Sequence, residues 1–185
     1  MRLREDATGH DSAVIQIRPL TVEDAEPLVD LLRSNREFLA PWQPIQAPEL
    51  FTLGGQRAAI ERLRDDQRHG LTVAHVILEA DRIVGRVTLS NIVRGPFQSC
   101  NIGYWISSAD NGRGHATAAV AEIAELAFSE LGLHRIEAGT LPHNVASQRV
   151  LQRNGFERFG FAKRYLQIAG QWQDHVLFQK LAPDG

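Results

Sequence analysis

The feature that most constrains the fold is a strand–helix–strand unit in the second half of the chain. Residues 99–107 form a strand-like run, a glycine-containing turn follows, and residues 116–131 repeat apolar side chains along one helical face before a second strand-like run at 134–141. Two strands joined by a helix lie parallel to each other. The other strand-like runs lie in hairpins or next to short helices, so we expect one parallel pair inside an otherwise antiparallel sheet.

The remaining elements are predicted on both sides of this unit. Strands are expected at 14–20, 71–79, 82–93, 157–168 and 172–181, and helices at 21–32, 52–69 and from about 145 to 153. The predicted class is therefore α/β (α+β), with a mixed, mostly antiparallel sheet of six to seven strands, a central βαβ crossover and a splay between its two parallel strands. Residues 1–13 are predicted to be a flexible arm and 14–182 a single domain. Three prolines, Pro41, Pro44 and Pro48, predict that residues 35–48 lack regular structure.

Composition excludes several classes of protein. The chain has 185 residues, a net charge of −2 and one cysteine, Cys100, so no internal disulfide or cysteine-based zinc site can form. A strong basic excess, typical of general nucleic-acid binders, is missing, as is metal-ligand spacing such as His-Glu-x-x-His. The chain also shows no signal peptide and no apolar run of membrane-spanning length. We expect a cytoplasmic protein with no metal, no direct nucleic-acid partner and no membrane partner, in which Cys100 is a half-buried strand residue.

A glycine-containing loop is the strongest local signal of function. Asn111-Gly-Arg-Gly-His stands between the strand at 99–107 and the helix at 116–131. Glycines allow a backbone to approach a ligand closely, and the first turn of a helix offers free N–H groups and a positive dipole end. The loop therefore predicts an anion site, with a plain strand-to-helix turn as the alternative. A third Rossmann glycine and the Gly-Lys-Ser/Thr of a P-loop are both missing.

Polar residues follow on the next strand and helix. Glu137, Asn144 and Ser147 are expected near the splayed ends of the parallel strands, where ligands bind in open α/β sheets. A carboxylate and a hydroxyl beside such a cleft are a candidate base and acid. For His175, next to Asp174, we expect a structural hydrogen bond rather than a catalytic pair.

These residues resemble the GCN5-related N-acetyltransferase (GNAT) superfamily, in which acetyl-CoA pyrophosphate is bound by a Gln/Arg-x-x-Gly-x-Gly/Ala loop similar to Asn111-x-x-Gly-x-Ala. Further stretches from about Ile15 to Leu181 look like the RimJ/RimL type, whose members acetylate N-termini of ribosomal proteins. These stretches are Asn35-Arg-Glu-Phe-Leu-Ala-Pro-Trp, Ile102-Gly-Tyr-Trp, Leu133-His-Arg-Ile-Glu-Ala, Pro142-His-Asn, Ser147 to Gly155-Phe156 and Gln171-Trp-Gln-Asp-His-Val-Leu.

The resemblance implies acetyl-CoA as cosubstrate, and it implies a set of binding residues. The residues implied for acetyl-CoA are the loop positions Arg113, Gly114, His115, Ala116 and Thr117, the strand positions Trp105, Ile106 and Ser107, and Asn144. The acceptor side is expected from the segment 35–48 and the turn at Gly170. Its candidates are Glu37, Phe38, Trp42, Tyr104 and Tyr165, although aromatic side chains often only pack in a core.

Three positions depart from the pattern of the family. Asn111 replaces the usual Gln or Arg, Asn101 replaces a frequent Glu, and Leu151 replaces the Tyr that often acts as the acid. Glu137, acting through water, is therefore predicted as the base, and Ser147, one helical turn before Leu151, as the acid; Ser147 could instead only cap or pack the helix.

The predicted reaction is transfer of an acetyl group from acetyl-CoA to a primary amine by direct attack in a ternary complex. The acceptor is expected to be the N-terminal α-amino group of a protein of the ribosomal type. Two alternatives stay open: a small amine such as a polyamine, amino acid or antibiotic, and a non-catalytic acyl-CoA-binding module. The chain is expected to be a monomer or a homodimer.

Overall fold

A mixed seven-stranded sheet forms the centre of the computed structural model, which describes residues 15–183. The strand order is β1-β2-β3-β4-β5-β7-β6, and every neighbouring pair is antiparallel except β4 and β5. The predicted mixed sheet with one βαβ crossover is confirmed, while the arm predicted for residues 1–13 lies outside the described residues. The strands are β1 (Ile15–Pro19), β2 (Val73–Glu79), β3 (Arg82–Val93), β4 (Ser99–Ile106), β5 (Arg135–Thr140), β6 (Glu157–Ile168) and β7 (Gln171–Leu181).

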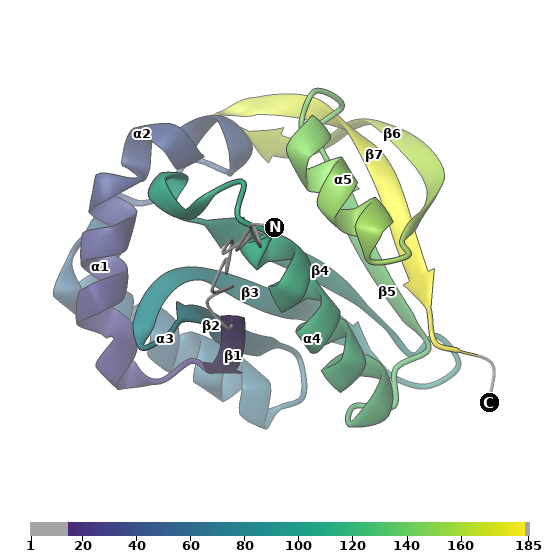
Figure 1. Cartoon of the computed structure of the whole chain (residues 1–185), viewed down its shortest axis with the longest axis horizontal. Coiled ribbons are helices and arrows are strands. Elements are labelled where there is room, and N and C mark those ends of the chain that lie inside the picture. The colour runs from purple at the N-terminus through teal and green to yellow at the C-terminus, as the bar shows by residue number, and fades with distance from the viewer. Residues whose placement is uncertain (1–14, 184–185) are drawn as a thin grey trace, which may run out of the picture.

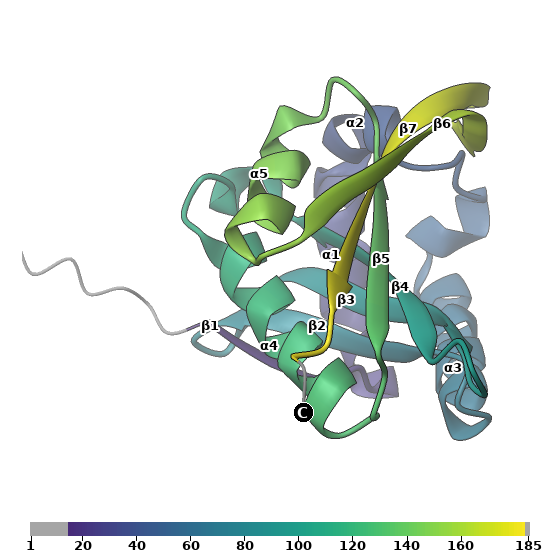
Figure 2. The same ribbon diagram turned by 90° about the vertical axis from the view of Figure 1, so that its right-hand side faces the viewer.

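Helices cover both faces of this sheet. Figure 1 shows α4 crossing in front of the strands and α5 lying over β6 and β7, and the side view of Figure 2 places α3 on the opposite side from α4 and α5. The α-helices are α1 (Ala25–Ser34), α2 (Arg36–Leu39), α3 (Leu53–Arg68), α4 (His115–Ser129) and α5 (Val145–Arg153). The 3-10 turns are η1 (Val22–Asp24), η2 (Ala40–Trp42), η3 (Pro48–Phe51) and η4 (Ser108–Asp110).

Each face of the sheet has its own apolar cluster. The larger one packs the buried face of α4, formed by Val120, Ile123, Ala124 and Ala127, against the central strands. These positions repeat at helical spacing, which is why the sequence predicts this helix correctly. The smaller cluster contains Leu28 of α1 and Ile60 of α3 and lies against β2 and β3. Because both faces of the sheet are covered, the site has a rigid frame.

Local signals at helix starts are confirmed. Thr21 and Asp24 form the predicted capping box, in which the Thr21 backbone N–H donates to Asp24 Oδ2 at 2.8 Å. Thr52 caps α3 by accepting a hydrogen bond from the Gly55 N–H at 3.1 Å. Such caps satisfy backbone donors that a helix leaves free at its first turn.

The segment 35–48 is more regular than we predict from its prolines. Residues Arg36–Leu39 form the short helix α2 and Ala40–Trp42 a 3-10 turn, because the first proline of the segment comes only after α2 has ended. Asn35 anchors the start of the segment: its Nδ2 donates to Leu31 O at 2.8 Å and its Oδ1 accepts from the Ser108 N–H at 2.8 Å. This bridge fixes the segment against the end of β4.

The two parallel strands separate after a short paired stretch. Residues Ser99–Asn101 of β4 pair with Arg135–Glu137 of β5, and no ladder pairs the rest of these two strands. The edge of β4 that faces β5 is therefore left without a strand partner from residue 102 onward. This divergence is the predicted splay.

Candidate active site

Two cavities meet at the splay. The first, which we call the loop cavity, has a volume of about 510 Å³ and lies between the end of β4, the start of α4 and α5. That volume suits a sizeable ligand. Its lining residues are Phe38, Leu39, Trp42, Tyr104, Trp105, Ile106, Asp110, Asn111, Gly112, Gly114, His115, Ala116, Thr117, Asn144, Ala146, Ser147, Arg149, Val150 and Arg153.

The second cavity, the splay cavity, has a volume of about 190 Å³. Consecutive residues of β4 and of β5 line it, and because consecutive strand residues point to opposite faces, the cavity lies in the gap between the strands. The two cavities share Trp42, Tyr104, Asn144 and Ser147. The lining of the splay cavity is Trp42, Ile102, Gly103, Tyr104, Ala138, Gly139, Thr140, Leu141, Asn144, Ser147, Leu151 and His175.

The glycine loop is shaped for an anion. Gly114 is the N-cap of α4 with a φ of 85°, and a Cβ built on it would meet no atom within 4 Å. The first backbone hydrogen bond of α4 runs from the Ala118 N–H to Gly114 O at 3.0 Å, so the N–H groups of His115, Ala116 and Thr117 have no acceptor within the helix. Open backbone and free N–H groups at a helix start fit a phosphate group.

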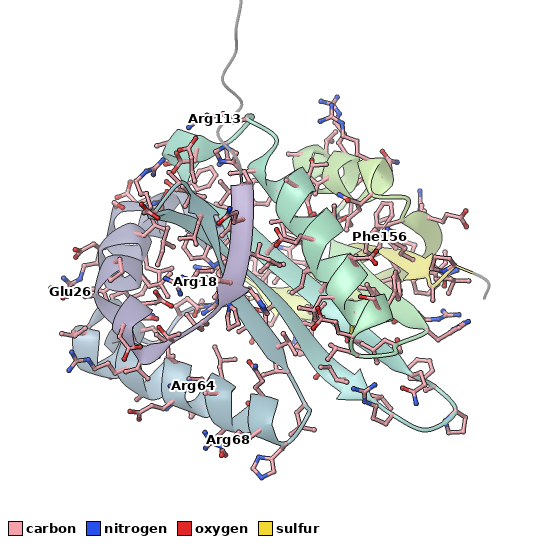
Figure 3. The ribbon with its side chains drawn as sticks, turned by 60° about the horizontal axis from the view of Figure 1, so that its bottom comes forward. Arg18, Glu26, Arg64, Arg68, Arg113 and Phe156 are labelled. Carbon is pink, nitrogen blue, oxygen red and sulfur yellow. The ribbon has the colours of Figure 1, made fainter. Side chains whose placement is uncertain are left out.

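The Arg113 side chain does not line the loop cavity. Its guanidinium forms an ion pair with Glu79 and lies 3.5 Å from Asp110 Oδ1. Figure 3 shows Arg113 at the turn that leads into α4. Arg82 donates to Asp110 at 2.7 Å, and this hydrogen bond is the main reason that the pKa of the Asp110 carboxyl is lowered. His115 is buried with its Nε2 3.5 Å from Glu79 Oε1, so Arg113 and His115 offer the loop cavity mainly their backbone.

The predicted acid Ser147 lies at the junction of the cavities. Its Oγ is 2.9 Å from the hydroxyl of Tyr104, and either atom can donate. Asn144, not Ser147, caps α5, since Asn144 Oδ1 accepts from the Ser147 N–H at 3.1 Å. Burial raises the pKa of Tyr104 to about 12, so its phenol stays protonated at neutral pH. The site therefore holds a hydroxyl pair that can donate a proton or a hydrogen bond.

The two predicted carboxylates lie outside both cavities. Glu137 sits on the last paired step of β4 and β5, opposite Asn101, with its Oε1 3.6 Å from Arg135 Nη1. Glu37 of α2 is exposed and lines neither cavity. A direct contact between either carboxylate and a ligand in the cavities is not part of this geometry.

The aromatic candidates divide into two groups. Phe38 and Trp42 line the loop cavity, and the Trp42 ring lies 5.5 Å from the ring of His143. Tyr165 lines neither cavity, but its ring centroid is 5.6 Å from that of His175. The hairpin that carries Tyr165 reaches the same wall, because the Ala169 N–H donates to Gln43 O at 3.0 Å.

The strand residues implied for the cofactor do not all line the loop cavity. Trp105 and Ile106 line the loop cavity, whereas Ser107 does not. The Ser107 N–H donates to Val84 O at 2.8 Å, and its side chain is buried against Asn35. Cys100 is fully buried rather than half-buried, and burial raises the pKa of its thiol to about 12, which fits the prediction that it is no nucleophile.

Sequence reasoning did not assign several residues that line the cavities, among them Arg149, Arg153, Thr140 and His175. Arg149 and Arg153, one helical turn apart on α5, line the loop cavity, and among the described residues neither has an ion-pair partner within 4 Å. Their spacing of four residues was the available signal. Thr140 and His175 line the splay cavity, and only the pairing of β5 with β7 brings them together.

Comparison with known proteins shows one family. Residues 15–157 match the acetyltransferase (GNAT) domain family. The chain is 41% identical over 174 residues to the "Probable N-acetyltransferase YjcK" of Bacillus subtilis (strain 168), covering 92% of this chain and 95% of that protein. It is 35% identical over 170 residues to the "[Ribosomal protein uS5]-alanine N-acetyltransferase" of Escherichia coli (strain K12), covering 91% of this chain and 88% of the relative.

Comparison with solved structures points to the same family. Mycobacterium smegmatis RimJ in complex with CoA-disulfide superimposes with a TM-score of 0.89 at 33% identity, covering 94% of this chain and 86% of that chain. Over residues 15–183, no helix is long and apolar enough to span a membrane, and no group of three or more His, Cys, Asp or Glu side chains is arranged to hold a metal ion.

Proposed function

The chain belongs to the GNAT acetyltransferase family and is an acetyl-CoA-dependent N-acetyltransferase, and we propose that its acceptor is the N-terminal α-amino group of a protein. The relative from Escherichia coli is named for alanine acetylation of ribosomal protein uS5. An acceptor of this type, a protein chain that begins with a small residue, is therefore the proposed substrate. The cytoplasmic location and the monomeric or homodimeric state remain part of the proposal.

The observation that carries the proposal is the junction between the two cavities. Acetyl-CoA in the loop cavity would place its thioester near Tyr104 and Ser147, where the splay cavity opens. The described lining of the splay cavity contains no Asp or Glu, so this cavity offers no carboxylate to a polyamine. An α-amine followed by a small apolar residue suits such a lining better than a polycation does.

The loop cavity fits the phosphate-bearing part of acetyl-CoA. The free N–H groups at the start of α4 suit the pyrophosphate, and the unpartnered edge of β4 suits the amide groups of pantetheine. Arg149 and Arg153 add two positive charges at the same cavity. Asn144 uses its side-chain oxygen to cap α5, which leaves its amide N–H groups for the cofactor arm.

The proposed mechanism is direct attack by the neutral amine on the thioester. An α-amino group has a pKa of about 8, against about 10.4 for a lysine side chain, so it loses its proton more easily near neutral pH. Ser147, hydrogen-bonded to Tyr104, donates to the leaving thiolate, and a backbone N–H near Trp105 or Ile106 stabilises the developing oxyanion. Glu137 would have to act through water, since it lies outside both cavities.

The test measures thiol release from acetyl-CoA with three acceptor classes. Peptides that begin with Ala or Ser should be acetylated, and a peptide with a blocked N-terminus and an internal Lys should not. Polyamines and single amino acids are the third class, and represent the alternative acceptors. Faster turnover of a small amine than of every peptide would contradict the proposed acceptor, although not the acetyltransferase activity.

A further inference from the structure

The wall of the splay cavity contains a buried histidine without an assigned role. His175 of β7 is only 3% exposed and lines the cavity together with Ser147 and Thr140. Its neighbours in sequence fix its direction. Val176 belongs to the core cluster beneath α4, and consecutive strand residues alternate between faces, so His175 points away from that core.

The tautomer of His175 follows from its hydrogen bond. Nδ1 lies 3.1 Å from the carbonyl oxygen of Gln173. A carbonyl only accepts, so in the neutral ring the proton is on Nδ1 and the lone pair is on Nε2. Over the described residues Nε2 has no hydrogen-bond partner in the protein, and the Asp174 carboxylate is used elsewhere, accepting from the Arg164 N–H at 2.8 Å.

The surroundings of His175 leave this lone pair accessible from the cavity. Its Cδ2, which adjoins Nε2, faces Gly139 of β5, where a Cβ would come within 3.4 Å of the ring. The Tyr165 ring packs against the imidazole with a centroid distance of 5.6 Å. Nε2 of His175 therefore lies at the wall of the splay cavity with no hydrogen-bond partner among the described residues.

We propose that His175 is the general base that takes a proton from the acceptor amine. This inference rests on the proposed direct attack by an amine held in the splay cavity. One ammonium proton moves to Nε2, and the freed nitrogen lone pair forms the C–N bond with the thioester carbonyl carbon. When the C–S bond breaks, a second proton ends on the sulfur through Ser147, and the third remains on the product amide. Imidazolium then returns its proton to water.

His175 is better placed for this role than Glu137. The imidazole lines the cavity, whereas the Glu137 carboxylate lies outside it beside Arg135. The other titratable group that lines the splay cavity is the phenol of Tyr104, while the phenol ring of Tyr165 packs against His175 outside the cavity lining. The described lining of the splay cavity contains no carboxylate, so no ion pair there would hold an imidazolium once it forms.

The experiment uses the acceptor that the wild-type enzyme acetylates fastest. His175→Gln keeps a donor for the Gln173 carbonyl but has no basic nitrogen, and His175→Ala leaves space for added imidazole. We expect kcat to fall about 10²- to 10⁴-fold in both variants, with an unchanged acetyl-CoA-induced rise in melting temperature. Free imidazole should restore part of the kcat of His175→Ala in proportion to its neutral fraction. His69→Gln, on an exposed residue at the end of α3, is the matched control.

Three results would overturn the inference. The first is a kcat of His175→Gln of at least a third of the wild-type value, and the second is no increase in the kcat of His175→Ala on addition of imidazole. The third is a greater loss of activity in Glu137→Gln than in His175→Gln. The last result would return the role of base to Glu137. Because each variant is compared with the wild type on the same acceptor, a failure of the proposed peptide acceptor is seen separately, in the wild-type acceptor series.

Discussion

Replacing Gly114 should abolish acetyl-CoA binding at little cost to the fold. Gly114 has a φ of 85° at the start of α4, and Gly132 has a φ of 61° just beyond the end of the same helix. A Cβ at either position would meet no atom within 4 Å, so neither substitution causes a clash inside the protein. Only Gly114 lines the loop cavity. The pair Gly114→Ala and Gly132→Ala therefore separates backbone strain from loss of the binding surface.

The expected magnitudes follow from strain and linkage. A left-handed conformation costs a residue with a Cβ roughly 1–2 kcal/mol, so both variants should lose about 2–8 °C in melting temperature without ligand. Acetyl-CoA at about 100 times its Kd stabilises the wild type by about 2.7 kcal/mol, which corresponds to a rise of about 5–11 °C. Gly132→Ala should keep this rise. Gly114→Ala should lose most of it, and the bulkier Gly114→Val should lose all of it.

The assay is thermal unfolding of each variant with and without saturating acetyl-CoA, supported by a direct Kd measurement. A Gly114→Val protein with the wild-type rise would show that the loop is only a turn. Loss of the rise in Gly132→Ala as well would show that backbone strain, not access to the loop, controls binding. Either result would refute the assignment of the anion site.

Three further outcomes are expected. Ser147→Ala should lower kcat about ten- to a hundredfold with little change in the Kd of acetyl-CoA, because it removes the hydrogen bond to the leaving thiolate. A wild-type kcat in this variant would show that Ser147 is not the acid. Trp42→Ala should raise the KM for the acceptor far more than the KM for acetyl-CoA, whereas equal increases would mean that Trp42 is a general packing residue. Burial lowers the pKa of His75 to about 4. Between pH 6.5 and 4 the unfolded chain therefore binds a proton that the folded protein does not. The free energy of unfolding should fall by about 3 kcal/mol as the pH drops through this window. In a urea-unfolding series from about pH 7 to about pH 4.5, His75→Leu should show a smaller decline in the free energy of unfolding than the wild type. An identical decline would contradict the lowered pKa of His75.

Local patterns carried most of the fold prediction. Apolar periodicity located α4 and the strands within one or two residues, since burial of one face is what those elements need. The capping residues Thr21 and Thr52 marked helix starts for the same local reason. The prediction for 35–48 was wrong at α2, because the first proline, Pro41, comes only after that helix has ended, and the bond from the Ser108 N–H to Asn35 that anchors the segment joins residues seventy-three positions apart.

The candidate site was less accessible to sequence reasoning because its contacts join distant segments. Ser147 and Tyr104 were chosen separately, and only the fold shows that their hydroxyl groups bond across forty-three residues. His175 was expected to make a structural hydrogen bond, which it does, but the splay that exposes its other nitrogen depends on where the pairing of β4 and β5 stops. Glu137 is the last residue of β5 that pairs with β4, so its strand position alone could not place it in or out of the cavity.

The early end of the pairing between β4 and β5 also affects the order in which products depart. The gap between the strands gives the acceptor an opening separate from the loop cavity that suits CoA. The acetylated product and free CoA can then leave by different routes, and neither has to wait for the other. In product-inhibition kinetics, CoA should compete with acetyl-CoA but not with the acceptor, and the acetylated product should show the reverse pattern.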